Sequence, residues 1–377
     1  MPKIHEKQMQ SMKILHLIPS LKKGGAERLV TDLVRELKTR PEIQVRLVIF
    51  RNEIEYNVED LRDVLHIIPS SVQLSIWKKN KLDVMQLQAI INDIQPDIIH
   101  SHLFEAEIVS RSCFYPKAKW FSHGHDNMKQ LSIKNKSLKE RLTQLFEKHF
   151  LTKRYEINHG NKFIVISKHS ETYFKKNIQK SPIYRLPNAI NFNKFVNFKI
   201  KREESHRIQL ISVGSLTTLK NHKFLIDVAD HLKQKNVHFQ MTILGDGPIR
   251  NELEELVKLK QLNGKVFFIG NQEKVEDFLW QSTIYLHSSM SEALGLALLE
   301  AMAAGLPVIT LDGGGNRDLI EEGKNGYMIF EENPQLFADK ISELWENQEK
   351  YKAMSQYAKQ YDIKPYVDKL LALYQSA

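Results

Sequence analysis

Residues 291–312 read SEALGLALLEAMAAGLPVITLD, and this stretch decides the fold class. An apolar helical segment follows Gly295 and ends near a second glycine, Gly305. The apolar run Pro307–Leu311 comes next and has the length of a buried strand. A helix that passes through a short glycine turn into a buried strand is the repeating unit of a parallel sheet with helices on its faces. The stretch therefore predicts an α/β protein.

The same alternation continues on both sides of this stretch. It falls into two groups of strands, and helical patterns separate the strands within each group. Each group has the pattern of an open, doubly wound parallel sheet. The expected strands of the first group are Lys13–Pro19, Val45–Phe50, Asp97–Ser101, Lys119–His123 and Phe163–Ser167, and those of the second are Gln209–Gly214, Phe239–Leu244, Val266–Ile269, Thr283–His287 and Pro307–Leu311.

The length of the chain also indicates two domains. A chain of 377 residues is too long for one ordinary domain and sufficient for two. Its hydrophobic periodicity is lost near Leu186–Arg202, which marks a boundary. We therefore predict an N-terminal Rossmann-like domain over residues 1–188, a C-terminal Rossmann-like domain over 189–360, and a separate final helix within 361–377.

The composition excludes several classes of protein. Apolar residues make up 42% and charged residues 26%, which is ordinary for a globular chain and excludes disorder, collagen and coiled coil. The single cysteine, Cys113, excludes a disulfide framework and a cysteine-based zinc cluster. The sequence has no uninterrupted run of 18 apolar residues and no secretory signal pattern, so we expect a cytoplasmic protein.

The net charge of +9 is divided unequally between the two halves. Residues 1–200 hold 34 Lys and Arg against 20 Asp and Glu, a balance of +14, and the remaining residues have a balance of −5. A basic half could meet phosphates, an anionic membrane or nucleic acid. The sequence contains no helix-turn-helix, zinc finger or aromatic RNA platform, so we expect no nucleic-acid partner.

One basic segment also carries an apolar stripe at helical spacing. A helix with apolar side chains on one face and Lys139, Arg141 and Lys148 elsewhere could lie on an anionic membrane surface. The protein would then be peripheral on the inner face of the cell membrane. The alternative, in which the stripe packs on its own domain, stays open. The stripe within Leu138–Phe150 consists of Leu138, Leu142, Leu145, Phe146, His149 and Phe150.

Ligands of doubly wound sheets bind at the carboxyl ends of the strands, so the residues after each strand are the first candidates for a site. Gly24 and Gly25 follow the first strand and precede a helix whose free N–H groups could face an anion, although a tight turn needs glycine too. His123, His125 and Asp126 end a later strand. They could be acid–base groups, metal ligands or hydrogen-bonding groups, but the sequence shows no further cluster of ligands that would favour a metal.

The second group of strands is followed by more candidates. Ser215 ends its first strand, and Lys220 comes before the next helix, where it could reach a phosphate as a point charge. Glycine-rich loops also lead into helices at Gly245–Gly247 and Gly313–Gly315. Phosphate binding explains this recurrence better than turn formation alone.

The most distinctive feature is a pair of glutamates eight residues apart, Glu292 and Glu300. Glu292 precedes a glycine turn, and Glu300 lies within a strongly apolar helix. A carboxylate there costs free energy unless it is paired or hydrogen-bonded, and sugar hydroxyls are suitable donors for it. The alternative is a salt-bridged or surface glutamate on a partly exposed helix.

These residues resemble the retaining glycosyltransferases of family 4, which have the GT-B fold. The resemblance covers nearly all of the chain from Met12 to about Ser355, and the two glutamates with the glycine turn and apolar helix are its most specific element. The motifs that carry it are GGAERL at 24–29, HGHD at 123–126, VIS at 165–167, LPNAIN at 186–191, VGSLTTLKNH at 213–222, ILGDGP at 243–248, FFIGN at 267–271, SEALGLALLEAMAAGLPVI at 291–309, GGGNRDLI at 313–320 and GKNGYM at 323–328.

The resemblance implies two Rossmann-like domains facing each other across a cleft, with the final helix packing back on the N-terminal domain. It implies an enzyme that moves a sugar, of the hexosyl type, from a nucleotide-sugar donor to a glycan or lipid-linked acceptor, with retention and without a metal or other cofactor. Bacterial polysaccharide or surface glycan synthesis is the expected setting. The implied catalytic residues are His123, Lys220 and Glu292; the implied donor-binding residues are Gly25, Ser215, Lys220, Gly245, Asn271, Glu292, Leu294, Gly295, Leu296 and Glu300; and those on the acceptor side are Gly24, His125 and Asp126.

One position departs from the family pattern. Where the family commonly has an arginine after the glycine of the VG strand end, this chain has Ser215, so the diphosphate site would lose one cation. Arg250, Arg317 or Lys223 could replace it. Two alternatives of function follow: a non-catalytic sugar-nucleotide-binding protein, and another GT-B enzyme such as a nucleotide-sugar 2-epimerase, against which GGAERL and the two glutamates argue.

Overall fold

The computed structural model describes residues 11–74, 78–125, 138–155, 161–178, 181–196, 207–347 and 357–376. The chain forms two compact units. Unit 1 comprises Met1–Ile166, Ser170–Leu186 and Ile363–Ala377, and unit 2 comprises Ser167–His169 and Pro187–Asp362. The boundary lies two residues before the one predicted at 188/189. Ser167–His169 belong to unit 2, and one contact they make there is a hydrogen bond of 2.6 Å from the Lys168 amide to the Asp318 carboxylate.

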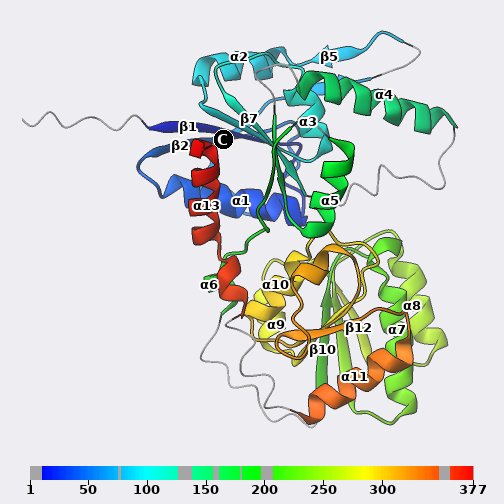
Figure 1. Ribbon diagram of the computed structural model, residues 1–377. Helices are drawn as coiled ribbons and strands as arrows, with labels where there is room; N and C mark the ends of the chain where they lie inside the picture. Colours follow the sequence, from blue (N-terminus) through cyan, green and yellow to red (C-terminus); the bar gives the residue numbers. More distant parts are fainter. Residues whose placement is uncertain are drawn as a thin grey trace, which may run out of the picture. The chain divides into compact units, whose positions relative to one another are not determined.

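Unit 1 is built on a parallel sheet whose strands have the order β3-β2-β1-β6-β7-β8-β9 (Figure 1). Apolar side chains of the central strands are buried on both faces, as a sheet covered by helices on both sides requires. The strands are β1 (Met12–Ile18), β2 (Ile43–Ile49), β3 (Leu65–Ile67), β6 (Ile98–His102), β7 (Lys119–Gly124), β8 (Lys162–Val165) and β9 (Ile183–Arg185), and a separate antiparallel pair is formed by β4 (Ser71–Gln73) and β5 (Lys81–Asp83).

The C-terminal helix α13 (Ile363–Ser376) belongs to unit 1 and lies beside α1 (Gly25–Lys38) (Figure 1). Arg40 pairs with Asp368 at 2.9 Å, and the Lys119 ammonium donates to the Tyr374 carbonyl at 3.0 Å. The helix therefore closes the unit with a segment that is far away in sequence. The other helices of unit 1 are η1 (Glu59–Leu61), α2 (Met85–Ile94), α3 (Phe104–Ser110), α4 (Leu138–Tyr155) and α5 (Lys168–Asn177).

Unit 2 is built on a second parallel sheet, with the order β12-β11-β10-β13-β14-β15. The strand order reverses between β10 and β13, as it does between β1 and β6 in unit 1, and ligands of such sheets bind at this switch point. The strands are β10 (Ile208–Val213), β11 (Phe239–Leu244), β12 (Val266–Gly270), β13 (Ile284–His287), β14 (Val308–Leu311) and β15 (Gly326–Ile329).

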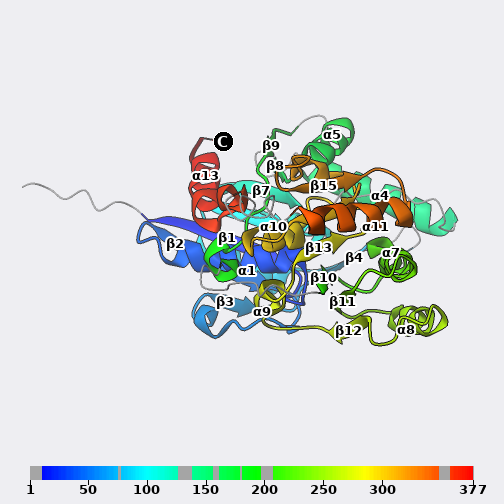
Figure 2. The same ribbon diagram turned by 90° about the horizontal axis from the view of Figure 1, so that it is seen from below.

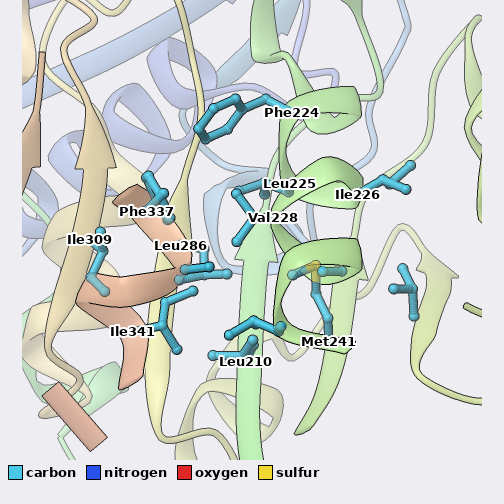
Figure 3. Close-up of a cluster of buried hydrophobic side chains, with 14 of the residues drawn as sticks. Leu210, Phe224, Leu225, Ile226, Val228, Met241, Leu286, Ile309, Phe337 and Ile341 are labelled. Carbon is cyan, nitrogen blue, oxygen red and sulfur yellow. The ribbon is translucent and has the colours of Figure 1, made fainter. Parts of the chain in front are cut away.

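The helices of unit 2 cover its sheet, and α7 (His222–Gln234) packs against α11 (Pro334–Glu346) on one face (Figures 1 and 2). Between these two helices and the strands lies the main core, where the Phe224 and Phe337 rings meet edge to face at a centroid separation of 5.3 Å (Figure 3). The remaining helices are α6 (Phe192–Phe195), η3 (Thr218–Lys220), α8 (Arg250–Leu259), α9 (Val275–Trp280), α10 (Leu296–Ala303), η4 (Gly315–Asp318) and η6 (Ala358–Tyr361).

Two parallel sheets with intervening helices confirm the predicted α/β class of two Rossmann-like domains. The sequence did not predict the edge strands β3, β9 and β15, nor α3, α5 and α11. The edge strands are three or four residues long, which is too short for a period-two pattern. None of the helices in the described ranges is long and apolar enough to cross a membrane.

Candidate functional site

The loops that follow β10 and β13 meet at the switch point of unit 2. Lys220 ends η3 after β10, and Glu292 lies after β13. Two hydrogen bonds fasten these loops together: the Met290 amide donates to the Leu219 carbonyl at 3.0 Å, and the Ser288 hydroxyl donates to the Lys220 carbonyl at 2.8 Å. The positions of the Lys220 ammonium and the Glu292 carboxylate are therefore coupled.

Glu292 is buried and ion-paired. Its Oε1 contacts the Lys220 ammonium and also lies 3.1 Å from Nε2 of His287. Burial alone would raise the pKa of the Glu292 carboxyl, but the charge of Lys220 and the hydrogen bond with His287 outweigh burial and hold that pKa well below its ordinary value. Glu292 is therefore a carboxylate at neutral pH. The sequence predicted Lys220 and Glu292 but missed His287, which lies within a strand and carries no motif.

The glycine loop after β14 fixes the backbone of Glu292 from the other side. The Glu292 amide donates to the Gly313 carbonyl at 2.8 Å, and the Gly315 amide donates to the Glu292 carbonyl at 2.9 Å. A Cβ atom on Gly315 would stand 1.9 Å from the Ala293 carbonyl oxygen, so only glycine permits this approach. The glycine triplet thus positions the carboxylate, which is a more specific role than the anion loop expected from sequence.

Glu300 lies in α10, which begins just after Gly295 at φ 98°. Its side chain is buried, so a surface position is excluded. The Tyr285 hydroxyl, which donates to the Val213 carbonyl at 3.2 Å, has its pKa raised by burial and then by the nearby charge of Glu300. Glu300 therefore lies close enough to Tyr285, which bonds to the last residue of β10, for their charges to interact. Leu294 is buried, and Leu296 and Gly295 are partly exposed at the helix start.

The loops after β10, β11 and β12 also approach one another through glycines. Gly245 has φ 130°, and a Cβ there would stand 2.0 Å from the Gly214 carbonyl oxygen; its amide donates to Gly270 at 2.9 Å. Ser215 and Asn271 are exposed beside these glycines. The result is a closely packed set of glycine loops, one of which, at Gly214, lies beside the Lys220 side chain.

The cations that could replace the missing arginine differ in how they are engaged. Arg250 hydrogen-bonds with Glu254 at 2.8 Å and lies 3.3 Å from Asp246. Arg317 pairs with Asp312, whereas Lys223 is exposed on the first turn of α7. Two of the three are therefore neutralised by carboxylates of their own loops.

The predicted residues of unit 1 lie at the ends of β1 and β7. Gly24 and Gly25 precede and begin α1, and the Gly24 carbonyl accepts a hydrogen bond from the Tyr56 hydroxyl at 2.8 Å. His123 is buried in β7, and His125 follows it with partial exposure. Asp126 lies outside the described residues. The structure thus groups these residues on unit 1 and the two glutamates with Lys220 on unit 2.

Three further histidines, all missed from sequence, join His123 and His125. His16 in β1 is the register partner of His100 in β6, and His102 in β6 is the partner of His123 in β7. The sequence holds two His-x-His patterns, at residues 100–102 and 123–125. Alternate residues of a strand face the same side, so each pattern places two histidines on one face. Recognising that these histidines lie together required the strand order, which places β6 between β1 and β7.

The pH dependence of unit 2 follows from Glu292. We expect Glu292→Gln to lower the stability of unit 2 by a constant amount from pH 7 down to about 4.5, the ordinary glutamate pKa. Below pH 4.5 the stability difference between wild type and variant should shrink. Glu292 then becomes protonated in the unfolded wild type, which stabilises the unfolded state, while its depressed pKa keeps it charged in the folded state. Urea unfolding at a series of pH values measures this. Glu252→Gln, on the exposed face of α8, should show no such dependence; an equal profile for both variants would contradict the ion pair.

Two family models together match almost the whole described chain. The model described as "Glycosyltransferase Family 4" matches residues 23–194, and the one described as "Glycosyl transferases group 1" matches residues 193–361. Their boundary falls close to that between the two units.

Individual relatives agree with these models. The glycosyltransferase MJ1178 of Methanocaldococcus jannaschii, which is uncharacterized, is 25% identical over 90% of both chains. EpsF of Bacillus subtilis strain 168, which is named as a glycosyltransferase, is 25% identical over 80% of this chain and 79% of the EpsF chain. The crystal structure of Anabaena HepE in complex with UDP-glucose superposes with a TM-score of 0.79 at 18% identity, over 97% of this chain and 100% of HepE. The chain belongs to glycosyltransferase family 4 and has the GT-B fold.

Proposed function

We propose that this glycosyltransferase moves a hexosyl unit from a nucleotide-sugar donor to a glycan or lipid-linked acceptor, with retention and without a metal. The single observation that carries the proposal is the coupled Lys220–Glu292 pair at the switch point of unit 2. A buried carboxylate and a cation held by two fastened loops give a polar, preorganised site at the strand ends, where doubly wound sheets bind ligands.

The donor is held by unit 2 in this proposal. Glu300 accepts hydrogen bonds from the ribose hydroxyls, and Glu292 accepts them from the sugar, since an ionised carboxylate is an acceptor only. The backbone N–H groups near Leu294, Gly295 and Leu296 face the diphosphate at the start of α10, where a helix has unpaired donors. Further donor contacts are assigned to Ser215, Gly245 and Asn271 of unit 2, and one is assigned to Gly25 of unit 1.

The chemistry follows from where charge develops. As the bond from the anomeric carbon to the diphosphate oxygen breaks, negative charge grows on the diphosphate and positive charge on the sugar. Lys220 stabilises the diphosphate, and its place beside Glu292 fixes it before the reaction begins. The acceptor oxygen bonds to the anomeric carbon on the same face, and its proton passes to the departing phosphate. His123 is assigned to the transferred sugar, and Gly24, His125 and Asp126 to the acceptor.

The structures of similar fold suggest which nucleotide to test first. Anabaena HepE was crystallised with UDP and glucose, and a pneumococcal O-GlcNAc transferase with a TM-score of 0.72 was crystallised with UDP and GlcNAc. A Staphylococcus aureus relative, 25% identical over 61% of this chain and 46% of its own length, is named poly(ribitol-phosphate) alpha-N-acetylglucosaminyltransferase. These likenesses support a uridine diphosphate sugar as donor and a bacterial surface polymer as acceptor.

A second proposal concerns the membrane. In α4 the side chains of Leu138, Leu142 and Leu145 are 74%, 40% and 64% exposed, whereas Leu151 and Tyr155 near its end are buried in the core of unit 1. Packing on its own domain therefore accounts for the end of the helix and not for its beginning. We propose that the exposed leucines insert into an anionic membrane surface, with the exposed Arg141 and Lys148 meeting its headgroups.

Donor binding is tested by thermal shift with UDP, GDP, ADP and their common sugar conjugates. We expect one nucleotide class, UDP in the first instance, to stabilise unit 2 by about 2.7 kcal/mol when it is present at about 100 times its Kd. Glu300→Gln should remove most of this shift, because the ribose loses its acceptor, and Glu252→Gln should keep it. Stabilisation that is equal in both variants would contradict the role of Glu300.

The role of Lys220 is tested by initial rates of sugar transfer. Lys220→Met should lower kcat about 10²–10³-fold, because it removes one group that stabilises the developing charge. Lys258→Met, at an exposed lysine on α8 of the same unit, is the matched control and should keep near-normal rates. Wild-type rates should be equal in EDTA and in Mg²⁺ or Mn²⁺. A loss of activity in EDTA that Mg²⁺ restores would contradict a metal-independent transfer.

Membrane docking is tested by co-sedimentation with vesicles. Wild-type protein should bind vesicles that contain an anionic lipid and not vesicles of phosphatidylcholine alone. The double variant Leu142→Ser/Leu145→Ser should lose binding because the apolar contact is removed. Leu259→Ser is the control, since that leucine is 80% exposed on α8 of unit 2. Binding that survives the double variant, or that Leu259→Ser abolishes equally, would contradict docking through α4.

A further inference from the structure

Five histidines form one cluster inside unit 1, at the switch point of its sheet. They come from β1, β6 and the end of β7, and the rings of neighbouring members lie 4.1–5.3 Å apart between centroids. The cluster consists of His16, His100, His102, His123 and His125. His16, His100 and His102 lie outside the motifs that carry the family resemblance, and the proposed transfer assigns them no role.

Three members of the cluster form a hydrogen-bonded chain. Nδ1 of His16 lies 2.9 Å from Nε2 of His102, and Nδ1 of His102 lies 2.8 Å from Nε2 of His125. Beside the chain, Nδ1 of His100 lies 2.5 Å from the Tyr374 hydroxyl. Within the described residues, the other ring nitrogens of His16, His100 and His125 are buried without a hydrogen-bond partner.

Neutral imidazoles alone cannot give every ring nitrogen of this chain a hydrogen-bond partner. Each has one N–H donor and one acceptor nitrogen, so either tautomeric direction of the chain leaves an unsatisfied nitrogen at both ends. A buried polar atom without a partner costs about 1–3 kcal/mol. A metal ion removes this cost at each ring nitrogen that presents a lone pair to it.

We propose that His16, His100 and His102 bind one divalent transition-metal ion of the zinc class. Each offers one ring nitrogen, and these three atoms lie within 4.8 Å of one another. Around a zinc ion at 2.0–2.1 Å from each nitrogen, tetrahedral ligands lie about 3.4 Å apart, so a small contraction closes the site. All three side chains are fully buried. Neutral imidazole suits zinc, copper, nickel and iron and disfavours magnesium and calcium, which take oxygen ligands.

The hydrogen bonds around the trio determine which nitrogens face the ion. Nδ1 of His100 is engaged by Tyr374, and Nδ1 of His102 is engaged by His125. Nε2 is therefore the ligand atom of His100. In His102 the same atom lies 2.9 Å from Nδ1 of His16, so the ion replaces that hydrogen bond when Nε2 of His102 binds it. A ligating histidine nearly always uses its second ring nitrogen in such a hydrogen bond, which orients the ring. Tyr374 and His125 are thus positioning residues, and Tyr374 comes from α13.

A second trio, His102, His123 and His125, also has ligand atoms within 4.8 Å. It shares His102 with the first trio, so one ion occupies one trio or the other. The first is favoured because its members are completely buried and because Nε2 of both His16 and His100 has no partner among the described residues. An ion there would join β1 and β6 and, through Tyr374, the C-terminal helix. It would stabilise unit 1, and the inference does not rest on the proposed transfer reaction.

The test is a Co²⁺ titration of the full chain, prepared without a histidine tag. Tetrahedral Co²⁺ has visible d–d absorption, so one equivalent should produce these bands, raise the Tm of unit 1 and be displaced by Zn²⁺. His16→Asn and His100→Gln should abolish the bands. His238→Gln, an exposed histidine of unit 2, is the matched control and should leave them unchanged.

Because a buried histidine variant could fail to fold, Tyr374→Phe provides a second measurement. It keeps the ring and removes only the hydroxyl that orients His100, so Co²⁺ should bind about 10–100-fold more weakly. Absence of visible bands in the wild type, or equal Co²⁺ affinity in wild type and Tyr374→Phe, would overturn the proposal. Bands that survive both His16→Asn and His100→Gln would also overturn it, because the ion would then occupy the other trio.

Discussion

The buried charge of Glu292 is the constraint on which the candidate site of unit 2 depends. A carboxylate withdrawn from water is stable only when it is paired, so Lys220 and His287 must reach it from two neighbouring strand ends. That requirement explains why the loops after β10 and β13 are fastened by hydrogen bonds, and why glycine is needed at Gly315. The site is thus a rigid assembly of backbone and charge, formed before any ligand arrives.

Unit 1 uses the same topological position differently. At its switch point the side chains are neutral imidazoles, and burial keeps them neutral. Unit 2 therefore carries fixed charges suited to an ionic ligand, whereas unit 1 offers lone pairs and N–H groups. Both sheets have a switch point at the same topological position. The fold therefore determines where a ligand can bind, and the side chains at the strand ends determine which kind of ligand binds there.

Much of the candidate site of unit 2 could be predicted from sequence because its signals are local. Glycines before helices and a carboxylate in an apolar helix are recognisable within a dozen residues. They singled out Lys220 and Glu292, which the structure pairs, and Glu300, which it buries. His287 could not be found, because a histidine inside a strand has no local signature. The exposure of Leu138, Leu142 and Leu145 was equally undecidable, since the apolar stripe of α4 has the same spacing whether it packs or faces solvent.

The sequence by itself determined the α/β class, the two Rossmann-like domains, the central strands and the family, because hydrophobic periodicity and glycine-rich motifs are properties of neighbouring residues. Tertiary structure alone decided which strands are adjacent. It thereby brought together His16 with His100, Lys220 with Glu292, and the C-terminal helix with residues of β6 and β7. The physical reason is that parallel strands pair through crossovers, so partners in a sheet are separated by many residues and their contacts leave no local pattern.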